Sequence, residues 1–66
     1  MNTNCLRGLR KLKRLSQTEF AKKFYTSPQM VRAWEAGTRD PDHETMCKIA
    51  EYFNTSVDYI WGYTDK

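Results

Sequence analysis

Two side chains between residues 28 and 36 carry hydrogen-bonding groups suited to reading DNA bases. If this segment is a helix, each residue turns by about 100°, so Gln29 and Arg32 share one arc, and Met30 and Trp34 lie opposite. In the major groove a glutamine pairs with adenine, and an arginine with guanine, through two hydrogen bonds. An ordinary amphipathic helix with one wet face has the same pattern, so the rest of the chain must decide between them.

A second pair with possible chemistry is His43 and Cys47, spaced by four residues, with Cys5 far away in the sequence. A structural zinc site takes four ligands, so these two do not suffice. A catalytic cysteine–histidine pair needs a third group to orient it and a pocket for substrate. The sequence therefore predicts no metal site, no cofactor and no enzymatic activity.

Charge is divided unequally along the 66 residues. Residues 1–39 carry nine basic and two acidic side chains, or +7; residues 40–66 carry two basic and six acidic ones, or −4, which together give +3. This asymmetry favours an anionic partner for the first half, nucleic acid being the usual one. The alternative is that the basic residues only solvate helix surfaces.

The sequence also indicates the cellular compartment in which the protein is expected. No apolar run reaches the roughly 18 residues of a membrane span, and the N-terminal sequence lacks the apolar core of a signal peptide. We expect one domain over residues 1–66, located in the cytoplasm with both thiols reduced. Neither a membrane nor a small-molecule ligand is expected as a partner.

Start and stop signals predict an all-α fold. Ser16 followed by Glu19 forms a capping box, Ser27–Pro28 starts a helix and Gly37 ends one. No alternating strand pattern is present. The predicted helices cover residues 4–14, 17–24, 28–36, 42–53 and 57–61. Only Tyr25 and Thr26 separate the second helix from the cap of the third, which is helix-turn-helix geometry.

The stretches "LRKLKRLSQTEFAKKFYTSPQMVRAWEAG" and "DPDHETMCKIAEYFNTSVDYIWG" resemble the Cro/repressor type of helix-turn-helix domain, also called the XRE or lambda-repressor-like family. The resemblance covers about residues 5–62. It implies a compact five-helix domain that binds operator DNA and regulates transcription, most often as a repressor of phage or mobile-element type. It also implies a homodimer on a palindromic site.

The resemblance assigns roles to individual residues. Base contacts fall on Gln29, Arg32, Ala33 and Pro28, and phosphate contacts on Gln17, Ser27, Thr38 and Arg39. In the family, the residue that matches Gln17 often also contacts the glutamine that matches Gln29. Arg10 and Glu35 match a buried ion pair that joins the first helix to the third.

Three positions depart from the family pattern. Tyr25 stands where a glycine is common, so it is expected in a left-handed conformation that is costly for a bulky residue. Thr26 replaces an apolar residue, and His43 occupies a commonly aliphatic position. These departures affect local geometry rather than the fold.

The C-terminal aromatic residues admit two interpretations. Tyr59, Trp61 and Tyr63 could form a dimer face, or Trp61 could pack against its own domain. A protein-interaction module, anti-repressor-like or antitoxin-like, is the alternative function. Its apolar contact area would come from Pro28, Met30, Ala33, Tyr59 and Trp61.

Overall fold

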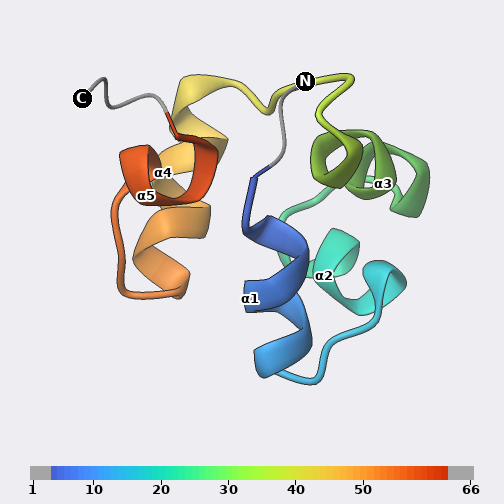
Figure 1. Cartoon of the computed structure of the whole chain (residues 1–66). Coiled ribbons are helices and arrows are strands. Elements are labelled where there is room, and N and C mark those ends of the chain that lie inside the picture. The colour runs from blue at the N-terminus through green and yellow to red at the C-terminus, as the bar shows by residue number, and fades with distance from the viewer. Residues whose placement is uncertain (1–3, 63–66) are drawn as a thin grey trace.

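The computed structural model of the protein describes residues 4–62, and these form five α-helices without a strand. The helices are α1 (Leu6–Leu12), α2 (Gln17–Lys23), α3 (Pro28–Ala36), α4 (His43–Tyr52) and α5 (Val57–Trp61). In Figure 1, α1 runs through the middle, with α2 and α3 on one side and α4 and α5 on the other. The all-α prediction is confirmed, although α1 and α4 are shorter than predicted at both ends and α2 ends at Lys23 instead of residue 24.

Side-chain caps explain where the helices begin. Ser16, Ser27, Asp42 and Ser56 each accept a hydrogen bond from the backbone N–H three residues later. The capping box predicted at Ser16 is complete, because the Glu19 carboxylate also accepts from the Ser16 N–H at 2.8 Å. Helix α1 has no such cap, but the Asn4 side chain accepts from the Leu6 N–H at 3.1 Å and so sets its later start.

Four helix ends share one turn geometry. After α1, α2, α3 and α4 the chain passes through a residue with positive φ: Arg14 (59°), Tyr25 (58°), Gly37 (82°) and Asn54 (57°). The N–H of the next residue then bonds to a carbonyl in the last helical turn, as Thr26 does to Ala21 at 3.0 Å. This is the Schellman arrangement, which satisfies carbonyls that the helix itself leaves unpaired. The left-handed conformation predicted for Tyr25 is present.

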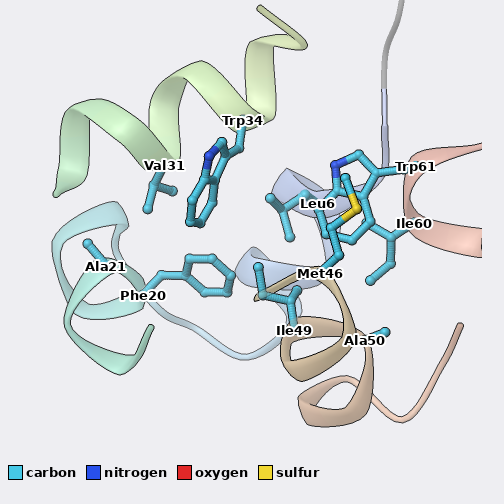
Figure 2. Close-up of a cluster of buried hydrophobic side chains, with 10 residues drawn as sticks. All are labelled: Leu6, Phe20, Ala21, Val31, Trp34, Met46, Ile49, Ala50, Ile60 and Trp61. Atoms are coloured by element: carbon cyan, nitrogen blue, oxygen red, sulfur yellow. The ribbon is translucent and has the colours of Figure 1, made fainter. Parts of the chain in front are cut away.

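Ten apolar side chains from all five helices form the core (Figure 2): Leu6, Phe20, Ala21, Val31, Trp34, Met46, Ile49, Ala50, Ile60 and Trp61. The core holds α3 in place, since Val31 and Trp34 both point into it. A ring cluster extends it at the ends of α2 and α4, where Phe20 stacks on Phe53 with ring centroids 6.0 Å apart. The arrangement leaves the opposite face of α3 outside the core.

The position of Trp61 corrects the prediction that this residue belongs to a dimer face. Only 7% of its surface is exposed, and Figure 2 shows it among Leu6, Met46 and Ile60. A five-residue helix that follows α4 closely must bury its large apolar residues against the same core. Trp61 is therefore a core residue and not part of an exposed dimer face. Tyr59 is 63% exposed, and Tyr63 lies outside the described residues.

Candidate nucleic-acid interface

Helices α2 and α3 are joined by residues 24–27. Ser27 begins α3 by accepting a hydrogen bond from the Met30 N–H at 3.2 Å, and Pro28 occupies the first helical position. Tyr25 makes the turn and is 95% exposed, so its ring contributes little to the packing of the turn. The short connection brings the start of α3 next to α2, and the two helices contact each other closely.

The two sides of α3 differ as the periodicity predicts. Val31 and Trp34 are buried, whereas Gln29 and Arg32 are exposed. Within residues 4–62, neither Gln29 nor Arg32 makes a side-chain hydrogen bond or ion pair, so their polar groups are available to a ligand. Pro28 and Ala33, the other two predicted base-contacting residues, are half-buried beside them.

The predicted ion pair between Arg10 and Glu35 is present. Arg10 Nε lies 2.6 Å from Glu35 Oε2, and Arg10 Nη2 donates to Glu35 Oε1 at 3.3 Å. The two side chains are 9% and 5% exposed. The remaining guanidinium nitrogen, Nη1, donates to the Leu15 carbonyl at 2.7 Å. The pair thus fixes α3 to α1 and to the loop that leads into α2.

Gln17 joins this cluster. Its Nε2 donates to Glu35 Oε1 at 3.1 Å, so the contact that the family often shows between this position and the recognition glutamine is replaced by one to Glu35. One amide N–H of Gln17 is thereby used inside the protein. Gln17 positions the carboxylate that holds α3, in addition to any contact it makes with phosphate.

A hollow of about 290 Å³ lies where α1, α2 and α3 meet. It is lined by Arg7, Gln17, Arg32, Glu35 and Ala36. Arg7 and Arg32 are both exposed, so two guanidinium groups border an open, positively charged recess. Guanidinium groups bind phosphate oxygens through paired hydrogen bonds. Sequence reasoning missed Arg7, although its spacing of three from Arg10 places both residues on one side of α1.

The predicted phosphate contacts flank α3 at both ends. Ser27 keeps its hydroxyl proton free to donate, because its oxygen acts as the acceptor in the cap. Thr38 instead donates its hydroxyl proton to the Ala33 carbonyl at 3.3 Å, so it must rotate before it can donate to phosphate. Arg39 is exposed just beyond the end of α3.

A group of three metal ligands and a membrane-spanning helix are both absent from residues 4–62. No group of three or more histidine, cysteine or acidic side chains lies close enough to hold a metal ion. No helix in that part of the chain combines the length and apolar character needed to cross a membrane.

Two helices joined by a short turn define a helix-turn-helix domain. Here the second helix, α3, packs against the core on one side and exposes polar residues on the other. A sequence model of the helix-turn-helix family (HTH_3) matches residues 6–60. The chain therefore belongs to this family, and the resemblance to the XRE type is confirmed.

Three similar proteins are all named as HTH-type transcriptional regulators. The chain is 37% identical over 62 residues to MJ0272 of Methanocaldococcus jannaschii, an uncharacterized HTH-type transcriptional regulator, with 94% of each chain covered. It is 34% identical to YqaE and 33% identical to YobD of Bacillus subtilis, both named in the same way, over 83% and 91% of this chain. Those matches cover 47% and 54% of the two Bacillus proteins, so the chain spans about half their length.

Proposed function

We propose that this protein binds double-stranded DNA in a sequence-specific manner by placing α3 in the major groove, and that it regulates transcription. The observation that carries the proposal is the arrangement of α3. Its inner side is fixed by Trp34 and by the Arg10–Glu35 pair, while Gln29 and Arg32 face outward with unpaired polar groups. The names of the similar regulators support this function.

In this proposal, Gln29 and Arg32 contact base edges, while Pro28 and Ala33 supply apolar contact such as that with a thymine methyl group. Ser27, Thr38, Arg39 and Gln17 hold the backbone, and Arg7 joins them at the recess beside Arg32. Phosphate contacts set the register of α3 on the duplex, whereas base contacts select the sequence.

We further propose that the protein acts as a repressor of phage or mobile-element type, as a homodimer on a palindromic operator. Two copies of α3 would then lie about 34–36 Å apart, one turn of the duplex. Tyr59 is the remaining exposed member of the predicted dimer face among the described residues. This function requires the compartment that holds the DNA, the cytoplasm in a bacterium or archaeon.

The protein-interaction alternative loses part of its support in the structure. Trp61 is buried, and Met30 packs partly against the core, so neither offers a free apolar side chain. Pro28 and Ala33 are half-buried on α3, and Tyr59 is exposed on α5. The polar face of α3 suits a base edge better than an apolar groove.

Selection of binding sites from random DNA, carried out with the wild type and two variants, tests the function. Gln29→Ala should lose its preference at one base position, with a cost of about 1–3 kcal/mol at the preferred sequence. Arg39→Ala, the matched backbone variant, should weaken binding to all sequences alike. Gln17→Ala is less suitable as a control because Gln17 also supports Glu35.

Three outcomes would reject the assignment. They are an absence of any enriched motif, a motif that Gln29→Ala leaves unchanged, and a motif that changes equally with Arg39→Ala. Circular dichroism of each variant verifies that the helices remain formed. Both substituted side chains are exposed, so neither variant should unfold.

A further inference from the structure

A histidine and a cysteine lie together on the surface of α4, a helix that carries none of the proposed DNA contacts. His43 is the first residue of α4 and Cys47 follows one turn later. Cys47 Sγ lies 3.5 Å from His43 Nε2, both residues are exposed, and Cys47 is a free thiol. Both donor atoms are therefore accessible from solvent.

The separation of the two atoms fits two ligands of one zinc ion. Tetrahedral zinc has Zn–S and Zn–N distances of about 2.3 Å and 2.0–2.1 Å, which place two such donors about 3.5 Å apart. The spacing of four residues brings the donors to the same side of α4. Zinc also accepts both donor types, thiolate sulfur and imidazole nitrogen.

One chain supplies only half of such a site. Within residues 4–62 no third histidine, cysteine or acidic side chain completes the group. A second copy related by a twofold axis presents the same pair, so an ion on the axis receives two sulfur and two nitrogen ligands. This set, two cysteines and two histidines, is a common structural zinc set.

We propose that His43 and Cys47 form a zinc half-site and that two copies of the protein share one Zn²⁺ through α4. Cys47 binds as a thiolate and releases its proton to solvent, and His43 binds as neutral imidazole through Nε2. No oxidation or reduction takes place. The inference does not depend on DNA binding.

The second cysteine provides a matched control. Cys5 is half-buried, and its Sγ lies 3.4 Å from the Tyr59 carbonyl oxygen and 3.7 Å from that of Ile60. It faces backbone oxygens rather than a nitrogen or sulfur ligand. A Cys5→Ser variant therefore keeps the proposed site and removes the other thiol.

Titration with Co²⁺ and Zn²⁺ under a phosphine reductant tests the site. Co²⁺ should produce a thiolate-to-metal charge-transfer band in the wild type and in Cys5→Ser, and Zn²⁺ should abolish it by displacement. Cys47→Ser should lose the band. His43→Ala should weaken zinc binding by more than about tenfold, a loss that even removal of an outer-shell partner causes.

Sedimentation of the same samples tests the sharing of the ion. The wild type and Cys5→Ser should form dimers with one zinc per two chains, and a chelator should return them to their zinc-free state. A band that persists in Cys47→Ser or disappears in Cys5→Ser would overturn the assignment. So would a complex of one zinc with one chain, an association state indifferent to zinc, or an absence of zinc binding.

Discussion

At the scale of single residues, Glu35 connects the parts that position α3. Its carboxylate accepts hydrogen bonds from Arg10 and Gln17, which come from two other helices. A buried carboxylate with its oxygens paired in this way is tolerated, whereas an unpaired one is costly. The orientation of the outward face of α3 therefore depends on Arg10, which does not touch the DNA in the proposed complex, and on Gln17.

Arg10→Met should lower the free energy of unfolding by about 3–5 kcal/mol, because it leaves the Glu35 carboxylate buried without its charged partner. Urea denaturation followed by circular dichroism measures this change. The double variant Arg10→Met, Glu35→Leu should recover part of the loss, since it removes the stranded charge. If Arg10→Met alone were as stable as the wild type, the pair would have no structural role.

The pair was predictable from the family resemblance, but the role of Gln17 was not. Sequence periodicity places Gln17 at the start of a helix and says nothing about which carboxylate its amide meets. Arg7 is a similar case, because the recess it lines forms only when α1, α2 and α3 pack together.

At the scale of the elements, the helices are defined mainly by their ends. Serine or aspartate caps start four of them, and a left-handed residue follows each of the five. Two of those left-handed positions hold Arg14 and Tyr25, residue types for which this conformation is unfavourable. The hydrogen bonds that close these turns, such as that from Thr26 to Ala21, keep the residues there.

Tyr25→Gly should stabilise the protein by about 0.5–1 kcal/mol. A left-handed L-residue costs roughly 1–2 kcal/mol, which exceeds the entropic cost of glycine, about 0.5–1 kcal/mol. Little packing is lost because the ring is exposed. Thermal unfolding should show the midpoint rise by a few degrees.

Tyr25→Ala is the control, because it removes the ring and keeps the Cβ atom. It should bring no stabilisation. An equal gain in both variants would mean that the ring, and not the backbone conformation, destabilises the wild type.

The caps also predict how stability responds to acid. Hydrogen bonds with the backbone N–H and then the side chain of Ser16 lower the pKa of Glu19 below its ordinary value of 4.5. Hydrogen bonds from the side chain and then the backbone of Thr45 lower the pKa of Asp42 below 3.8. A carboxylate with a lowered pKa stabilises the fold above its ordinary pKa, and this contribution is lost as pH falls below it.

The free energy of unfolding should therefore decline as pH falls from about 5 to about 3. The double variant Glu19→Gln, Asp42→Asn should show a shallower decline in denaturation curves over the same range. Glu51→Gln, which removes an exposed carboxylate outside the caps, is the control. A slope that the double variant leaves unchanged would contradict this role of the caps.

At the scale of the whole molecule, the two halves of the chain differ in net charge and in the helices that they contribute. The basic first half contains the helix-turn-helix and the recess beside Arg7, while the acidic second half contributes α4 and α5. In Figure 1, α1 lies between these two parts. The first half of the chain therefore carries both the excess of positive charge and the helix that we propose enters the major groove.

DNA affinity should fall log-linearly with salt, with a slope of about −0.9 for each phosphate contacted. Arg7→Ala should reduce the magnitude of that slope by about one contact. Lys48→Ala removes the same charge from α4, where Lys48 lies 3.6 Å from Glu44, and should leave the slope unchanged. Fluorescence anisotropy at several salt concentrations measures both slopes, and equal slopes for the two variants would show that Arg7 contacts no phosphate.

The organisation of the chain as one domain stays a prediction. One domain over residues 1–66 is expected from length, and the archaeal relative matches it almost end to end. The two Bacillus relatives extend to about twice the matched length.

The sequence by itself determined the five helices, the turn and the family. These features depend on residues a few positions apart: a serine and the N–H groups after it, a proline at a first turn, a left-handed residue at an end. Helix propensity and capping act over that range, so they can be read along the chain.

Only the tertiary structure decided four features. They are the burial of Trp61, the hydrogen-bond partner of Gln17, the recess beside Arg7, and the distance between His43 Nε2 and Cys47 Sγ. The first three depend on how separate helices dock. The fourth depends on the rotamers that two neighbouring side chains adopt. The residue type alone does not tell whether an apolar side chain is exposed or belongs to the core. Its burial depends on how the helices pack against one another.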